Sequence, residues 1–193
     1  MARFIVGITG ASGSIYGARL IEELLKQRNE VYLIITENGR RVLEFELELN
    51  FRKWIDKLNR LYGGLNLCNI NDMFSSVASG SFKTDGMVIA PCSMGSLAKI
   101  SNGITDNLLI RAADVIIKEK RKLILVPRET PFSSIHLRNM LILSDLGVAI
   151  LPPMPAFYNK PKTIDEIVNN TVGRVLASLD LENTLYKEWN GVR

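Results

Sequence analysis

Two short segments rich in glycine and serine follow apolar runs, and each could hold a phosphorylated or flat ligand. The first is Gly7-Ile-Thr-Gly-Ala-Ser-Gly13, and the second is Ala90-Pro-Cys-Ser-Met-Gly-Ser-Leu97. Missing side chains let a backbone approach a ligand, and the start of a following helix favours an anion. The first spacing, G-x-x-G-x-x-G, differs from the dinucleotide fingerprint G-x-G-x-x-G, so a turn that only packs strand on helix remains the alternative. The two segments together predict a ligand clasped at one sheet edge, where Thr9 and Ser12 would supply hydroxyls.

A charged pair stands between two prolines in the segment Val126-Pro-Arg-Glu-Thr-Pro131. Arg128 could bind a phosphate through two hydrogen bonds, and Glu129 could transfer a proton. A surface ion pair is the alternative. His136 is the only histidine, and one histidine cannot assemble a metal site, so we expect it to make a hydrogen bond at a helix start.

The length and composition are typical of one compact domain. The 193 residues are 47% hydrophobic and carry a net charge of +4, but the basic residues alternate with acidic ones, so we expect no nucleic-acid partner. No apolar run approaches the length of a membrane span. Cys68 and Cys92 fit neither a disulfide framework nor a zinc site, which predicts a reduced, cytoplasmic protein. We expect Cys92 to be a small buried apolar residue.

Strand-like and helix-like segments alternate along the chain. Short β-branched runs predict strands at residues 3–9, 30–36, 85–90, 122–126 and 147–151. Helical spacing predicts helices at 15–28, 105–120, 134–145 and 164–179, and less clearly at 51–62. This alternation predicts a single α/β domain over 1–193 with a mainly parallel, Rossmann-like sheet covered by helices on both faces. The proline-rich stretch 151–161 should be an ordered loop.

Three stretches resemble the UbiX flavin prenyltransferases, and the resemblance extends over nearly the whole chain. They are GITGASG at 7–13, the run from Ala90 to Met140 that includes LLIRAADV and VPRETP, and LPPMPAFYNKP at 151–161. The resemblance implies a flavoprotein fold, a homododecamer with sites between subunits, FMN as acceptor, and dimethylallyl monophosphate as donor. It also implies that the prenylated FMN passes to a UbiD-type decarboxylase.

The resemblance assigns binding roles by position. The implied FMN contacts are Gly10, Ala11, Ser12, Thr36, Ser93, Met94, Gly95, Ser96 and Arg128, with Arg111 lining the flavin site. The implied contacts to the donor phosphate are Lys118, Arg128, Tyr158 and Arg174, some of them from neighbouring chains. Trp189 resembles the tryptophan of a C-terminal segment, here 181–193, that closes over the site.

The resemblance also assigns catalytic roles. Glu129 resembles an acid that handles a proton at the phosphate, and Ser12 with Glu46 a pair that helps to deprotonate the flavin. Glu44 or Glu48 could take the place of Glu46. Lys118 would act with two arginines to stabilise the leaving phosphate electrostatically, so we expect no metal requirement.

Two other functions are compatible with such a fold. An FMN-dependent cysteine decarboxylase would show a P-A-S-A-N-T turn and a histidine near the first helix, whereas this chain reads Pro91-Cys-Ser-Met-Gly-Ser96 and has no histidine there. A non-catalytic flavin-binding subunit would have no need of Glu129 or Lys118.

Overall fold

The computed structural model describes residues 1–186 and 191, and its centre is a six-stranded sheet. The strands are β1 (Arg3–Ile8), β2 (Glu30–Ile35), β3 (Leu65–Cys68), β4 (Gly86–Cys92), β5 (Leu123–Pro127) and β6 (Ala149–Ile150). They lie in the order β3-β2-β1-β4-β5-β6, and every neighbouring pair is parallel. The predicted single-domain α/β architecture with a parallel sheet is confirmed.

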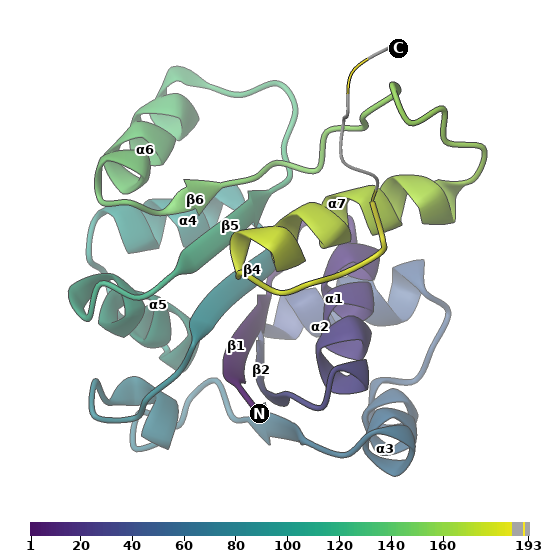
Figure 1. Ribbon diagram of the computed structural model, residues 1–193. Coiled ribbons are helices and arrows are strands. Elements are labelled where there is room, and N and C mark those ends of the chain that lie inside the picture. The colour runs from purple at the N-terminus through teal and green to yellow at the C-terminus, as the bar shows by residue number, and fades with distance from the viewer. Residues whose placement is uncertain (187–190, 192–193) are drawn as a thin grey trace.

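Helices cover both faces of this sheet (Figure 1). They are α1 (Ser14–Lys26), α2 (Glu37–Glu46), α3 (Phe51–Leu61), α4 (Met94–Ser101), α5 (Leu108–Lys118), α6 (Ser134–Asp145) and α7 (Ile164–Ser178), with a short 3₁₀ helix at Ser76–Ala78. Alternate residues of β1 point to opposite faces, as the two-residue period of a strand requires. Phe4 joins the core under α1, α2, α3 and α7, whereas Ile5 joins the core under α4, α5 and α6.

The strand order reverses between β1 and β4. From β1 the chain moves outward through β2 to β3, and it then returns to place β4 on the other side of β1. In open parallel sheets, ligands bind outside the carboxyl ends of the strands at such a reversal. The two glycine- and serine-rich segments follow β1 and β4, so the topology places them side by side at that point.

Most predicted elements are present, and three were not foreseen. Helix α3 confirms the helix expected at 51–62, and α5, α6 and α7 lie within or close to their expected ranges. Strand β3 and helices α2 and α4 were missed. Strand β6 is only two residues long, shorter than expected, because only Ala149 and Ile150 pair with β5. Among the described residues, no helix combines the length and apolar character needed to cross a bilayer.

Candidate functional site at the carboxyl edge of the sheet

A buried hydroxyl joins the two glycine- and serine-rich segments, the first turn (7–13) and the second turn (90–97). Thr9 follows β1 and is 1% exposed. Its Oγ1 donates a hydrogen bond to the carbonyl of Pro91 at 2.8 Å and accepts one from the backbone N–H of Ser93 at 2.7 Å. The hydroxyl of Thr9 therefore points into the protein, not toward a ligand as the sequence analysis expected.

The first turn ends at helix α1, whose N-terminus already holds an anion. Gly13 adopts a left-handed conformation with φ of 100° immediately before the helix. The Glu46 carboxylate, at the end of α2, accepts hydrogen bonds from the N–H groups of Gly13 (3.0 and 3.1 Å) and Ser14 (2.9 Å). The α1 N-terminus, where we expected a ligand anion, is thus capped by a side chain of the same protein.

Hydrogen bonding keeps Glu46 ionised. Burial opposes its ionisation, but the Ser12 hydroxyl and the N–H groups of Ser14 and Gly13 outweigh burial and lower the pKa of the Glu46 carboxyl. Glu44 instead accepts from the Phe51 N–H at 3.0 Å and pairs with Arg40. Of the candidate glutamates, Glu46 is the one that contacts the first turn.

The second turn leads into helix α4, and there is open space beside the start of this helix. Ser93 is the N-cap of α4, and its Oγ accepts from the Ser96 N–H at 3.3 Å. A β-carbon added at Gly95 would meet nothing within 4 Å, so the space beside the first turn of α4 is open. A helix N-terminus with open space beside it can receive an anion or the polar edge of a flat ligand.

The carboxyl end of β2 adds the N-cap of α2 to this edge. Thr36 caps α2 by accepting from the Gly39 N–H at 2.9 Å, and its own N–H donates to the carbonyl of Ile8 at 3.0 Å. A β-carbon on Gly10 would lie 2.8 Å from the β-carbon of Asn38 in α2. The close approach of α2 to the first turn therefore requires glycine at position 10.

The third turn brings a positive charge to the same edge. Arg128 follows β5 and is half-buried, and its Nε donates to the carbonyl of Ser12 at 3.2 Å. Its backbone N–H donates to the carbonyl of Cys92 at 3.3 Å. Glu129 is exposed and accepts from the N–H of Thr130 at 3.0 Å. The two charged side chains turn to different partners instead of forming the surface ion pair that was the alternative.

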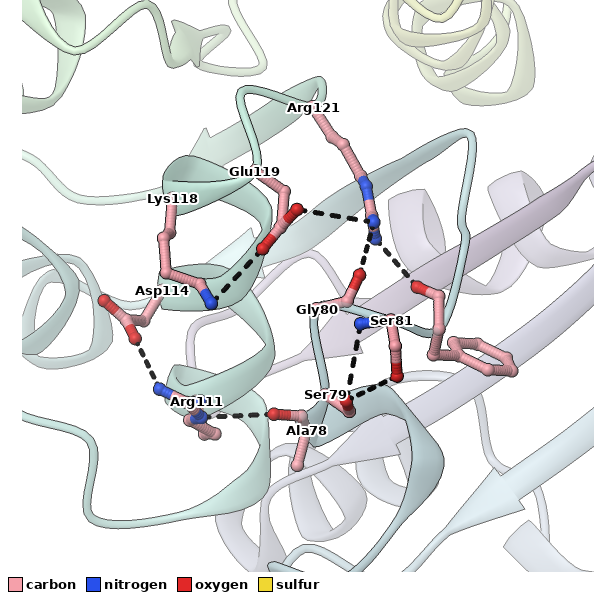
Figure 2. A network of polar contacts seen from close by, with 10 residues as sticks. Ala78, Ser79, Gly80, Ser81, Arg111, Asp114, Lys118, Glu119 and Arg121 are labelled. Atoms are coloured by element: carbon pink, nitrogen blue, oxygen red, sulfur yellow. Dashed lines mark hydrogen bonds and ion pairs between the residues drawn. The ribbon is translucent and has the colours of Figure 1, made fainter.

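Helix α5 carries the predicted site residue Lys118 away from this edge and bears Arg111 near its start. Lys118 ends α5 shortly before β5 begins and therefore lies at the amino edge of the sheet. Figure 2 shows its Nζ beside the Glu119 carboxylate, 3.2 Å away. Arg111 binds Asp114 at 2.8 Å and the carbonyl of Ala78 at 3.2 Å. One chain alone does not bring Lys118 to the three turns.

The remaining predicted residues lie on the C-terminal third of the chain. Tyr158, in the loop after β6, is 45% exposed. Arg174 lies on the exposed face of α7, with its guanidinium carbon 6.0 Å from the ring centroid of Tyr186. Trp189 lies outside the described residues, as does much of the predicted closing segment 181–193.

Two residues that could have carried other chemistry have structural roles. Cys92 is fully buried, and burial raises the pKa of its thiol to about 12, so it is not a ready nucleophile. The Nδ1 of His136 accepts from the Ser133 N–H at 3.2 Å, while the Ser133 hydroxyl accepts from the His136 N–H. Both expectations are confirmed: Cys92 is a small core residue, and His136 caps the start of α6.

The three turns thus lie together at the carboxyl edge of a parallel sheet, where an anion or a flat ligand could bind. The positive end of α4 and the Arg128 guanidinium lie at this edge, and the exposed Glu129 follows Arg128 in the chain. The family model described as Flavoprotein matches residues 1–176. The chain belongs to this flavoprotein family.

Individual relatives show which group within the flavoprotein family the chain belongs to. A flavin prenyltransferase UbiX of Methanocaldococcus jannaschii is 50% identical over 190 residues, covering 98% of this chain and 100% of the relative. The crystal structure of AnUbiX in complex with FMN and dimethylallyl pyrophosphate has a TM-score of 0.92 and 40% identity, covering 100% of this chain and 99% of that one. A dodecameric FMN-dependent UbiX-like decarboxylase from Escherichia coli O157:H7 has a TM-score of 0.91 and 45% identity, covering 98% and 100%. Within the flavoproteins, the chain belongs to the UbiX flavin prenyltransferases.

Proposed function

We propose that this protein binds FMN at the three-turn edge and transfers a dimethylallyl group from dimethylallyl monophosphate to N5 and C6 of the reduced flavin. The observation that carries the proposal is the meeting of the three turns at one edge. Arg128 in the third turn donates hydrogen bonds to the carbonyls of Ser12 in the first turn and Cys92 in the second. The Thr9 hydroxyl joins the first turn to Pro91 and Ser93 in the second. The AnUbiX protein, with a TM-score of 0.92 to this chain, was crystallised with FMN and dimethylallyl pyrophosphate.

The residues at this edge fit a flavin mononucleotide. The open space at Gly95 leaves room beside the start of α4, and the helix start and Arg128 favour a negatively charged group. Gly10, Ala11, Ser12, Thr36, Ser93, Met94 and Ser96 complete the proposed contact set. Reduced FMN supplies the nucleophilic atoms, and the protein supplies position and charge.

The phosphate of the donor leaves with negative charge, and cations would stabilise it. Arg128 lies at the edge itself. In the proposal, Lys118, Tyr158 and Arg174 are the other residues that contact the donor phosphate, and Arg111 lines the flavin. Glu129 is exposed beside Arg128, where it can exchange a proton with a phosphate oxygen. The site needs no metal if these cations carry the charge.

The proposed site is complete only when several chains assemble. Lys118 lies at the amino edge and the three turns at the carboxyl edge, so Lys118 would have to come from a neighbouring chain. An exposed apolar surface on α6 favours assembly, and it comprises Ile135, Leu137, Leu141, Ile142 and Leu146. The E. coli neighbour is described as dodecameric. We therefore propose a homo-oligomer, a dodecamer, with sites between subunits.

Two further parts of the proposal concern the cellular setting. Both cysteines are free thiols, as a reducing compartment requires, and this supports a cytoplasmic location. We also propose that the product serves a UbiD-type decarboxylase, a step that rests on family membership alone.

A cysteine decarboxylase of the same fold is the main alternative function. Its turn would read P-A-S-A-N-T, whereas this turn places Cys92 in the core and Ser93 as a helix cap. A non-catalytic flavin-binding subunit is the other alternative, and it gives no reason for the exposed Glu129 beside Arg128.

One experiment separates these functions. The protein is incubated without oxygen with reduced FMN and dimethylallyl monophosphate, and the extracted flavin is analysed by mass spectrometry. We expect the mass of FMN to increase by one dimethylallyl group. Flavin recovered unchanged, from protein that binds FMN, would exclude the transferase and leave the binding subunit. Loss of carbon dioxide from a cysteine-ended peptide would favour the decarboxylase.

A further inference from the structure

The hydroxyl of Thr9 has a fixed donor and a fixed acceptor partner. It is almost fully buried, it donates to the Pro91 carbonyl at 2.8 Å, and it accepts from the Ser93 N–H at 2.7 Å. The backbone N–H of Thr9 also donates to the Pro91 carbonyl, at 3.2 Å. Buried polar groups are costly to leave unpaired, so losing the hydroxyl would disturb both partners on the second turn.

The bond to Ser93 reaches the start of α4. Ser93 is the N-cap of this helix, and its side chain accepts from the Ser96 N–H while its backbone N–H is held by Thr9. The orientation of the first turn of α4, next to the open space at Gly95, therefore depends on a residue that follows β1. Beyond the last β1–β4 pair, Gly7 with Ile89, the Thr9 hydroxyl thus adds two hydrogen bonds between the first turn and the second.

We propose that Thr9 is a positioning residue for the flavin: it touches no ligand, but it holds the two turns at the spacing that FMN requires. The inference rests on the proposed function, in which both turns contact FMN. Direct binding explains neither the burial of the side chain nor its bonds, because the hydroxyl is shielded from solvent and both its partners are backbone groups of the second turn.

The test compares Thr9→Val with Thr9→Ser. Valine keeps the branched shape and removes the hydroxyl, whereas serine keeps the hydroxyl and removes the methyl group. The dissociation constant for FMN is measured by fluorescence titration of each flavin-free protein. We expect Thr9→Val to raise it at least tenfold, which is about 1.4 kcal/mol, and Thr9→Ser to stay within about twofold of the parent protein.

Thr171 provides a matched control. It is also buried, and its Oγ1 donates to the carbonyl of Ile167 within α7 at 3.5 Å, far along the chain from the turns. Thr171→Val should leave the FMN dissociation constant unchanged. If Thr9→Val binds FMN as tightly as Thr171→Val does, the proposal is overturned, and Thr9 has a role in stability only.

The outcomes separate this inference from the proposed function. A parent protein that fails to bind FMN contradicts the function, whereas parent and Thr9→Val proteins that bind equally contradict only the inference. If Thr9→Val does not fold, the titration of this variant is replaced by a measurement of amide hydrogen exchange over residues 91–97 of the flavin-free parent protein. We then expect the Ser93 amide to be protected. Exchange at the rate of an open loop would overturn the proposal.

Discussion

Replacing Glu46 with glutamine tests whether its charge holds the first turn in place. The Glu46 carboxylate accepts from two backbone N–H groups, those of Gly13 and Ser14, at 2.9 to 3.1 Å. A glutamine side chain has one accepting oxygen, and its amide group would face a second donor. The variant therefore loses at least one charge-assisted bond and the favourable interaction of an anion with the start of α1.

The expected loss of stability is moderate because Glu46 is only partly buried. A hydrogen bond to a charged group contributes about 1.5–3 kcal/mol, and an anion at an exposed helix start about 0.3–1 kcal/mol. Solvent reduces both contributions at this position. We expect Glu46→Gln to lower the free energy of unfolding by about 1–2 kcal/mol at neutral pH.

The loss should depend on pH in a defined direction. The pKa of Glu46 is lowered in the folded protein from its ordinary value of 4.5. A carboxyl with a lowered pKa stabilises the fold fully above its unfolded pKa, and this contribution disappears as the pH falls through the folded pKa. The difference between the parent protein and Glu46→Gln should therefore be constant near neutrality and shrink below 4.5.

Urea unfolding at a fixed protomer concentration measures this difference. Glu48→Gln is the matched control, because Glu48 is exposed two residues further along and should change stability little. Equal unfolding curves for Glu46→Gln and Glu48→Gln at neutral pH would refute the capping role. A difference that persisted unchanged in acid would show that charge is not its cause.

Three further changes have defined outcomes. Arg121→Met removes hydrogen bonds of 2.7 and 2.8 Å to the carbonyls of Gly80 and Phe82 (Figure 2). The variant should lose about 2 kcal/mol of unfolding free energy in urea, and its amides across 78–82 should exchange faster. Unchanged exchange there would show that Arg121 does not hold this loop. His136→Ala removes one half of the α6 capping box and should lower stability by about 0.5–1 kcal/mol, with no loss counting against it. Leu141→Asp places a charge on the exposed apolar surface of α6 and should give a smaller assembly in analytical ultracentrifugation, whereas an unchanged mass would exclude this surface as an interface.

The sequence predicted the sheet and its turns because both have strong local signals. Central strands such as β4 are buried on both faces and read as continuous apolar runs, and small residues mark where they end. Strand β3 lacks that signal, since Asn66 and Leu67 are exposed at the sheet edge and only four residues pair. Helix α4 was missed because its eight residues begin inside a segment read as a turn.

Long-range pairing was beyond the reach of local patterns. Glu46 lies 33 residues from Gly13, and nothing in the helical spacing of α2 selects it over Glu44 or Glu48. The resemblance proposed Glu46 by position, and the structure shows the physical difference: Glu44 is engaged by Phe51 and Arg40. The inward direction of Thr9 is likewise a tertiary property, because a threonine after a strand can face either way.

The distribution of charge supports the proposal that the site is complete only when several chains assemble. Helix α5 runs from the carboxyl edge of the sheet to the amino edge, so Lys118 at its end is separated from Arg128 by the full height of the strands. Among the described residues, Lys118 forms an exposed ion pair with Glu119, and such pairs contribute little to stability. A lysine held so weakly can exchange its partner for a phosphate on a neighbouring chain at small cost. The three turns of a single chain hold one of the proposed phosphate-binding cations, Arg128. Assembly would then add the positive charge of Lys118 from a neighbouring chain to the same edge.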